Sequence, residues 1–284
     1  MDPPASFVRI GPALPAGPVV VSVPHGGRDY PAGMAGALRV PIAALRPLED
    51  RHVDTLALAA VSAETAFVQR LPRAWIDLNR GEDERDPLID EGADPRRQRA
   101  PSAKLRGGLG LVPRRLAATG DIWRHRLSDA AVRARIDGAH RPYHRALGEA
   151  LAAAQARFGT AVLVDLHSMP PLGACGEAAQ IVFGDRFGRS AAARFVARLE
   201  AECEAAGLLH ALNTPYAGGH ILDRHGVPAH GVHAVQIEID RALYLDAALD
   251  APGAGLARVA RLLRAMFAAL ADEALATRTA LAAE

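Results

Sequence analysis

Two histidines of this 284-residue chain come shortly after apolar, β-branched runs, the composition typical of a buried strand. His25 follows the run Val19–Val23, and His167 follows the run Ala161–Asp165. Open α/β sheets bind ligands beyond the carboxyl ends of their strands, so we expect both imidazoles at one edge of a sheet. Neutral imidazoles are natural ligands for a divalent metal of the zinc class. The two positions therefore predict a metal site.

A third ligand is expected, because catalytic zinc usually has three protein ligands and one open position. The segment 50–54, which reads Asp-Arg-His-Val-Asp, offers two carboxylates. If this segment opens a helix, Asp50 and Asp54 lie at i and i+4 on one face, where one can ligate and the other can orient a ligand. In the alternative interpretation, Asp50 caps the helix and Asp54 is solvated. The residues alone leave this choice open.

Asn79 and Arg80 directly follow a predicted strand, Ala74–Leu78. A planar guanidinium group matches a carboxylate with two parallel donors, which suits a substrate with an anionic end. Alternatively, Arg80 forms an ordinary surface ion pair. The two residues are candidates for binding the substrate.

Glu238 lies inside another predicted strand, Ala234–Ile239, with apolar neighbours on both sides. A carboxyl group in such a position is either paired in the core or held in a cleft with a raised pKa. The second state is the one required of a general base that acts on metal-activated water. Glu238 is therefore the candidate catalytic base.

Two further segments carry weaker signals. Residues 213–220, which read Asn-Thr-Pro-Tyr-Ala-Gly-Gly-His, form either a glycine-rich loop that approaches a ligand closely or an ordinary surface turn. Arg141–His144, together with His140, lie in a helical region where Pro142 forces a local break. A helix boundary packed on the core is the alternative interpretation of that segment.

The candidate residues need a scaffold, and the sequence predicts one of α/β class. Short β-branched runs alternate with longer Ala/Leu/Arg segments of helical period, which is typical of a domain with largely parallel strands. We predict strands at Val19–Val23, Ala74–Leu78, Thr160–Leu166, Gln180–Phe183 and Ala234–Ile239. We predict helices at Val53–Ser62, Asp129–Phe158 with a bend or break at Pro142, Ser190–Ala206, and from Gly255 to the C-terminus.

One long segment, residues 80–113, has little apolar period and carries glycine, proline and clustered charges. A loop of this length in a compact domain is usually functional or mobile. No internal repeat, linker or break in composition divides the chain. We therefore expect residues 1–284 to form a single catalytic domain.

Charge and composition exclude several classes of partner. The chain has 33 Lys and Arg against 32 Asp and Glu, so it lacks the basic excess that neutralises a nucleic acid backbone. No run reaches about 18 apolar residues, and the N-terminus lacks a basic region followed by an apolar one. Two cysteines, Cys175 and Cys203, allow neither a disulfide framework nor a CxxC site. These features predict a cytoplasmic protein with no nucleic acid or membrane partner.

Seven short motifs occur in order along the chain, from about Val19 to Tyr244: Val23–Gly27, Asp50–Asp54, Ile76–Arg80, Pro142–His144, Asp165–Ser168, Tyr216–His220 and Gln236–Glu238. In this set and order the chain resembles the N-formylglutamate amidohydrolase family. That family is similar to the zinc carboxypeptidases in fold and metal chemistry. The resemblance therefore implies a three-layer α/β sandwich around a mixed, mostly parallel sheet.

The resemblance also implies roles for individual residues. His25 and His167 would bind one zinc ion per chain, with Asp54 as the third ligand and Asp50 as the alternative. The carboxypeptidase pattern has a glutamate at the third position after its first histidine, where this chain has Arg28. The resemblance further implies that Asn79 and Arg80 hold a substrate carboxylate and that Glu238 is the general base. Substrate contacts are implied for Tyr216, Gly219 and His220.

The implied reaction is zinc-dependent hydrolysis of an N-formyl amino acid, N-formyl-L-glutamate in the family, to formate and L-glutamate in histidine breakdown. A second arginine would add electrostatic stabilisation, with Arg85, Arg106 and Arg224 as candidates. The alternatives are a metal-dependent deacylase or peptidase for another N-acyl or amidated substrate, and a binding protein without turnover. We expect a monomer or a small homo-oligomer.

Overall fold

The computed structural model describes residues 5–94, 96, 102–173 and 177–281. The chain divides into two compact units, each built from three separate chain segments. The first unit contains Met1–Val8, Pro24–Asp50 and Gln69–Arg145, and the second contains Arg9–Val23, Arg51–Val68 and Ala146–Glu284.

Seven strands form one sheet in the order β1-β3-β2-β6-β9-β7-β8. The strands are β1 Phe7–Ile10, β2 Val19–Val23, β3 Thr65–Gln69, β6 Ala161–Met169, β7 Ile181–Gly184, β8 His210–Leu212 and β9 Val232–Asp240. β2 pairs in parallel with β3 and β6, β6 with β9, and β7 with β8, whereas β7 runs antiparallel to β9. The prediction of a mixed, mostly parallel α/β sheet is confirmed.

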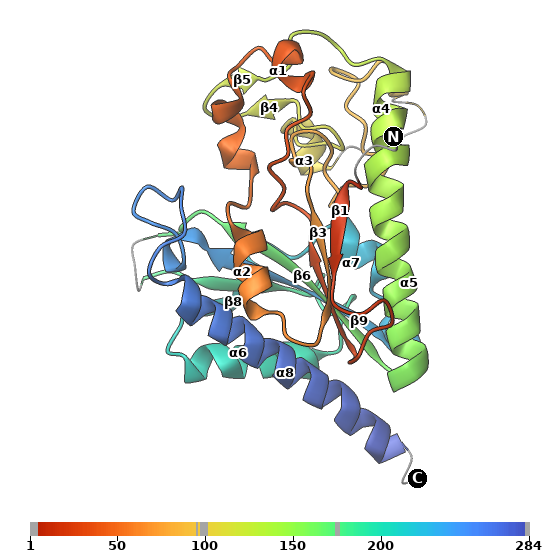
Figure 1. Cartoon of the computed structure of the whole chain (residues 1–284), viewed down its shortest axis with the longest axis vertical. Helices are drawn as coiled ribbons and strands as arrows, with labels where there is room; N and C mark the ends of the chain where they lie inside the picture. Colours follow the sequence, from red (N-terminus) through yellow and green to blue (C-terminus); the bar gives the residue numbers. More distant parts are fainter. Residues whose placement is uncertain (1–4, 95, 97–101, 174–176, 282–284) are drawn as a thin grey trace. The chain divides into compact units, whose positions relative to one another are not determined.

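One face of the sheet in the second unit is covered by three helices, α2 (Val53–Ala60), α6 (Ala193–Ala205) and α8 (Leu256–Leu281) (Figure 1). Alternate residues of the central strands, such as Val21, Val164 and Ile237, join these helices in one buried core. Because side chains alternate across a strand, every second residue faces this apolar layer.

The opposite face carries the intervening residues, and several of them are polar. Among them are Ser22, Asp165, His167, Gln236 and Glu238, all buried. Helix α7 (His220–His225) contacts β6 and β9, and α5 (Arg141–Phe158) approaches α7 where Gly148 meets His225. The three layers put an apolar core on one side of the sheet and a buried polar face on the other.

The first unit is rich in loops and buried ion pairs. Its helices include α1 (Met34–Ala37), η1 (Ile42–Leu48), α3 (Ala103–Arg106) and α4 (Asp129–Arg135), and a short hairpin joins β4 (Arg115–Leu116) to β5 (Gly120–Asp121). The guanidinium of Arg135 lies 3.7 Å from the centre of the Trp75 ring and 5.0 Å from that of Trp123. Burial lowers the pKa of Arg135 to about 10, although Asp90 raises it. Charged side chains therefore take up part of the core in this unit.

Most predicted elements are confirmed, with two differences. The predicted strand Ala74–Leu78 does not form, since Asp77 N–H donates to the Leu111 carbonyl and Trp75 N–H to that of Pro72, so no strand ladder is made. The alternation of apolar residues there reflects burial of Ala74, Ile76 and Leu78 in an irregular segment. The predicted helix Asp129–Phe158 is divided into α4, a π-helix η2 (Ile136–His140) and α5.

Within the described residues, no helix combines the length and the apolar composition needed to cross a membrane. Cys203 is buried in α6, and burial raises the pKa of its thiol to about 12. Cys175 lies outside the described residues. The remaining short helices of the second unit are η3 (Pro228–His230) and η4 (Arg241–Leu243).

Candidate functional site

His25 lies two residues beyond the end of β2, and two carboxylates flank its ring. Its Nε2 is 2.7 Å from Asp77 Oδ1, and its Nδ1 is 3.6 Å from Asp50 Oδ2. The backbone N–H of Asp50 also donates to the His25 carbonyl at 3.1 Å. All three side chains are buried. The first unit thus holds an imidazole between two acids.

Asp77 connects His25 to the residues that follow it in the chain. Its Oδ1 also accepts the Asn79 N–H at 2.8 Å, and its Oδ2 accepts Arg73 Nε at 2.9 Å. Burial by itself would raise the pKa of Asp77, but the charges of Arg73 and Arg80 and the hydrogen bond from His25 hold it well below the usual range. Asp77 is therefore ionised and fixes the His25 ring as a hydrogen-bond donor through Nε2.

The arrangement around His25 fits one half of a zinc site. Because Nε2–H donates to Asp77, the lone pair of Nδ1 is directed to the Asp50 side, as is usual for a metal-bound histidine with a carboxylate partner. Two atoms that bind one tetrahedral zinc ion at about 2.0–2.1 Å lie roughly 3.3–3.5 Å apart. The observed 3.6 Å between Nδ1 and Asp50 Oδ2 is close to that spacing.

His167 in β6 has the same kind of partner within the second unit. Its Nε2 lies 2.9 Å from Asp165 Oδ2, and Asp165 Oδ1 accepts the Ser22 hydroxyl at 2.9 Å. The two residues are separated by one position, so their side chains point to the same face of the strand. His167 is thus oriented as His25 is, with Nε2–H on a buried carboxylate and Nδ1 on the opposite side of the ring.

Glu238 of β9 is paired with His167 in the register of the two parallel strands. The amide of Gln236 donates to Glu238 Oε1 at 3.0 Å, and the Glu238 side chain is buried. The sheet register therefore brings together an imidazole and a carboxylate on its polar face.

The segment 50–54 does not form one helical face. Helix α2 begins at Val53, and His52 before it adopts a left-handed conformation with φ of 55°. Asp50 consequently lies in the chain before the helix, and Asp54 lies in its first turn. The expectation that both acids share a helical face at i and i+4 is wrong, because Asp50 precedes the helix and the left-handed His52 interrupts the helical path between them. Of the two acids, Asp50 is the one seen beside His25.

Arg80 and Asn79 are held in a turn of the first unit. Arg80 Nε donates to the Leu109 carbonyl at 2.9 Å, and Nη1 donates to the Asn79 carbonyl at 2.6 Å. Within the part of the chain that the structure describes, no hydrogen bond engages Arg80 Nη2. The guanidinium is buried and oriented, and one of its nitrogens keeps both donors for an anion.

The three arginines considered for a second anionic contact have different surroundings. Arg85 donates from Nη2 to Asp90 and Asp129 at 2.6 and 2.8 Å, and the hydrogen bond to Asp90 is the main reason that its pKa is raised. These ion pairs give Arg85 a structural role and make it a poor candidate for binding the substrate. Arg106, at the end of α3, and Arg224, in α7, are both exposed.

The glycine-rich segment 213–220 is a tightly fixed loop that leads into α7. Asn213, with φ of 60°, donates from its amide to Asp185 Oδ1 at 2.7 Å. A Cβ atom on Gly184 of β7 would lie 2.7 Å from the backbone of residues 217 and 218, so only glycine permits this approach. Tyr216, Gly219 and His220 are all half-buried. The loop is a rigid element beside the sheet.

We expect His225, in the last turn of α7, to make stability depend on pH. Burial, with the charges of Arg224 and His220, lowers the pKa of His225 to about 3. Below pH 6.5 the His225 imidazole binds a proton in the unfolded chain but stays neutral in the native protein. The free energy of unfolding therefore falls as pH decreases from about 6.5 toward 3. Urea unfolding at pH 7.5 and pH 5 should show a loss from His225 on the order of 1–2 kcal/mol, so that His225→Gln reduces the difference between the two pH values by that amount while the smaller contribution of His233, whose pKa burial lowers to about 4, remains.

The exposed His230 provides the control for this measurement. His230→Gln should retain the pH dependence of the wild-type protein. An unchanged difference between the two pH values in His225→Gln would contradict the assignment to His225.

Two acids of the site were missed by sequence reasoning. Asp77 and Asp165 each stand two positions before a candidate residue, Asn79 and His167. A spacing of two places side chains on one side of an extended segment, and this signal could have suggested Asp165 as the partner of His167. No local signal joins Asp77 to His25, 52 residues away.

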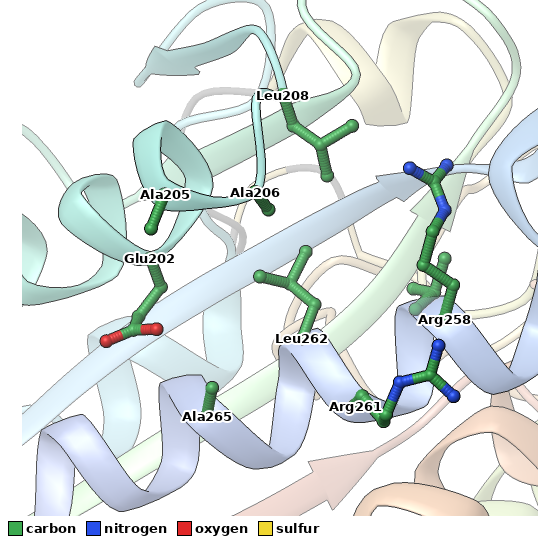
Figure 2. Close-up of a pocket in the computed structure, with 9 residues that line it drawn as sticks. Glu202, Ala205, Ala206, Leu208, Arg258, Arg261, Leu262 and Ala265 are labelled. Atoms are coloured by element: carbon green, nitrogen blue, oxygen red, sulfur yellow. The ribbon is translucent and has the colours of Figure 1, made fainter.

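A surface pocket of about 410 Å³ lies away from this polar face, between α6 and α8 (Figure 2). Leu208 and Leu262 line it, with Arg258 and Arg261 of α8 and Glu202 of α6 at its sides. It belongs to the helical layer on the apolar side of the sheet and contains no metal-ligating set. We therefore do not place the chemistry there.

Comparison with known proteins gives consistent matches. The model of the family described as N-formylglutamate amidohydrolase matches residues 17–245. An N-formylglutamate deformylase of Pseudomonas aeruginosa is 32% identical over 279 residues, which cover 91% of this chain and 93% of that protein. A second N-formylglutamate deformylase, from Pseudomonas putida, is 29% identical over 236 residues, 81% of this chain and 82% of that protein.

Two solved structures are similar over almost the whole chain. The crystal structure of N-formylglutamate amidohydrolase from Ralstonia eutropha JMP134 superposes with a TM-score of 0.86 and 34% identity, covering 95% of this chain and 98% of that one. A protein of Agrobacterium tumefaciens superposes with a TM-score of 0.70 and 21% identity, covering 97% and 96% of the two chains. The second match shows the fold alone.

Proposed function

The chain belongs to the N-formylglutamate amidohydrolase family, and on that premise we propose that it hydrolyses the formyl amide bond of N-formyl-L-glutamate to give formate and L-glutamate. The observation that carries the proposal is the pairing of His167 with Glu238 on a buried polar face, with His167 oriented by Asp165. The similarity to two N-formylglutamate deformylases and to the structure of an N-formylglutamate amidohydrolase supports N-formyl-L-glutamate as the substrate.

We propose one divalent metal ion, zinc, with His25 and His167 as two of its ligands. β2 and β6 are in register up to Ser22 and Asp165. His25 follows Ser22 by three residues and His167 follows Asp165 by two, and consecutive Cα atoms are about 3.8 Å apart. The chain therefore reaches each histidine within two or three residues of this paired position.

For the acidic ligand we propose Asp50 in preference to Asp54, which the family resemblance had favoured. Asp50 lies 3.6 Å from His25 Nδ1, the ring nitrogen that does not face Asp77, whereas Asp54 belongs to the first turn of α2. The chemistry that zinc supplies when bound is polarisation of the acyl oxygen and a lower pKa for water. Two imidazoles and a carboxylate are a usual donor set for that ion.

Glu238 acts as the general base and acid in this proposal. Its carboxylate takes a proton from the attacking water and delivers it to the nitrogen of the leaving amine, so the amide C–N bond breaks as the C–O bond to water forms. The Gln236 amide donates to Oε1, which holds the carboxylate in place while the other oxygen handles the proton. The net products are formic acid and the free amino acid.

Arg80 and Asn79 bind a carboxylate of the substrate, and the loop residues Tyr216, Gly219 and His220 form the other part of the substrate site. Holding the anionic end fixes the formyl amide relative to Glu238. We further propose that residues 1–284 act as one catalytic domain, as a monomer or small homo-oligomer, in the histidine breakdown of the cytoplasm. The family match from 17 to 245 includes segments of both units, which supports the single domain.

Arg80→Ala is expected to raise KM for N-formyl-L-glutamate about 10- to 100-fold, since it removes hydrogen bonds between charged groups worth about 1.5–3 kcal/mol. Arg80→Lys should recover only part of the affinity, because an ammonium group lacks the planar pair of donors. Steady-state formate release measures both variants. The exposed Arg115 of the same unit gives the control, Arg115→Ala, which should behave as wild type. An unchanged KM in Arg80→Ala would contradict the proposal that Arg80 binds the substrate carboxylate.

Formate release from a panel of substrates, with zinc content measured on the same samples, tests the proposed function. The panel is N-formyl-L-glutamate, N-formyl-L-aspartate, N-acetyl-L-glutamate and a formylated hydrophobic amino acid. Preference for N-formyl-L-glutamate supports the proposal. Preference for another member identifies a different N-acyl amino acid deacylase, and no cleavage of any formyl amino acid with zinc present refutes the proposal in favour of a binding protein.

A further inference from the structure

The π-helix η2 (Ile136–His140) is an irregular turn inside an otherwise continuous helical segment of the first unit. At its end the Arg141 N–H donates to the Ile136 carbonyl, five residues back. Pro142 follows, and it can neither donate to the carbonyl of residue 138 nor fit against it in a regular α-helix. A wider turn before Pro142 relieves this conflict. Such π turns occur frequently at functional sites.

Two histidines four positions apart, His140 at the end of the π turn and His144 in the next helical turn, lie side by side, as residues at i and i+4 of a helix do. The rings of His140 and His144 have centroids 4.4 Å apart, and both side chains are buried. His140 Nε2 lies 2.8 Å from the Arg80 carbonyl oxygen, and His144 Nε2 lies 2.9 Å from the Leu78 carbonyl oxygen. Because a carbonyl only accepts, both rings carry their proton on Nε2. The pair therefore donates to alternate carbonyls of one short segment.

That segment, Leu78–Arg80, needs such support because no strand ladder holds it. The two histidines bind the carbonyls on either side of Asn79, and the carbonyl of Asn79 itself accepts Arg80 Nη1 at 2.6 Å. The orientation of the guanidinium thus depends on a backbone that the histidines fix. A preorganised cation binds an anion more tightly, because less freedom is lost on binding.

We infer that His140 and His144 are positioning residues for the carboxylate anchor Arg80, a role that rests on the proposed function of Arg80. They act through the carbonyls of residues 80 and 78 and do not contact the substrate. The two rings reach both carbonyls from neighbouring turns of one helical segment. The motif Pro142–His144 and the motif Ile76–Arg80 are, in this account, two parts of one substrate-binding structure.

A double-mutant cycle tests the inference. His140→Leu and His144→Leu each should raise KM for N-formyl-L-glutamate about tenfold, with a smaller change in kcat, because each removes one hydrogen bond that fixes Arg80. In the Arg80→Ala background the same substitutions should change kcat/KM by less than about twofold, since their effect passes through Arg80. His144→Gln, which keeps an N–H donor, should recover part of the loss.

Val132→Ala is the matched control, because Val132 is a buried side chain of α4 in the same unit and belongs to none of the site motifs. It should lower the unfolding midpoint as much as His144→Leu does, and it should leave KM near the wild-type value. Equal rises in KM for the control would show that loss of core packing explains the effect, and would overturn the inference.

The outcomes separate this inference from the proposed function. In one outcome, Arg80→Ala raises KM and each histidine substitution raises KM further by its full factor in the Arg80→Ala background. That result would support the binding role of Arg80 and refute the positioning role of the histidines. If Arg80→Ala has no effect, both are refuted. If the leucine variants do not fold, ¹⁵N NMR of the wild-type imidazoles decides, because protonation of either ring on Nδ1 alone refutes the inference, whereas exchange-protected Nε2–H groups support it.

Discussion

Replacing Glu238 with glutamine is expected to lower kcat for formate release about 10³-fold while zinc content and the unfolding transition stay as in the wild type. A positioned general base contributes about 10²–10⁴-fold to such a reaction, and an amide cannot take the proton of water. The new amide oxygen can still accept the Gln236 hydrogen bond that Glu238 Oε1 accepts at 3.0 Å. The variant therefore separates proton transfer from structure.

Kinetics and metal analysis on the same preparation measure this prediction. Glu204→Gln in α6 is the matched control, because Glu204 is an exposed glutamate of the same unit. It should retain full activity. Near-normal kcat in Glu238→Gln would require another base, and loss of zinc from it would indicate that Glu238 is a ligand.

His167→Ala is expected to abolish zinc binding and activity together, because the proposed site then loses one of three protein ligands. Asp165→Asn should have a smaller effect, a 10- to 100-fold weaker affinity for zinc, since Asp165 orients the His167 ring from 2.9 Å without contacting the ion. The expected order of zinc affinity is wild type, then Asp165→Asn, then His167→Ala.

Zinc titration into chelator-treated protein measures this order. His230→Ala, at an exposed histidine of the same unit, should bind one zinc ion per chain as wild type does. One zinc ion per chain in His167→Ala would refute the ligand role. Equal losses in Asp50→Asn and Asp54→Asn would likewise argue against Asp50 as the single acidic ligand.

The central strands could be predicted because of how they are buried. β2 and the first half of β6 are covered on both faces by protein, so Val19–Val23 and residues 161–164 are nearly continuous apolar runs, whereas β9 alternates apolar residues with buried polar ones. The same rule produced the false strand Ala74–Leu78, where apolar residues are buried without a partner strand. The short strand β3, Thr65–Gln69, was missed because it is brief and begins and ends with polar residues.

The candidate residues were predictable as chemical groups but not as pairs. His167 and Glu238 were both placed in or after strands, and strand register sets them side by side. Our proposal of Asp50 over Asp54 depends on where α2 begins and on the left-handed conformation of His52, which is uncommon for residues other than glycine. Sequence period alone placed both acids on one helical face.

The sequence by itself determined the buried strands, the polar groups near their carboxyl ends and the family, because each is written in runs of neighbouring residues. Only the tertiary structure decided which carboxylate orients each imidazole and what holds Arg80. His25 meets Asp77 across 52 positions, and His140 meets the Arg80 carbonyl across 60. Contacts between such distant residues depend on how loops return the chain to itself, and no local period of apolar residues encodes that path.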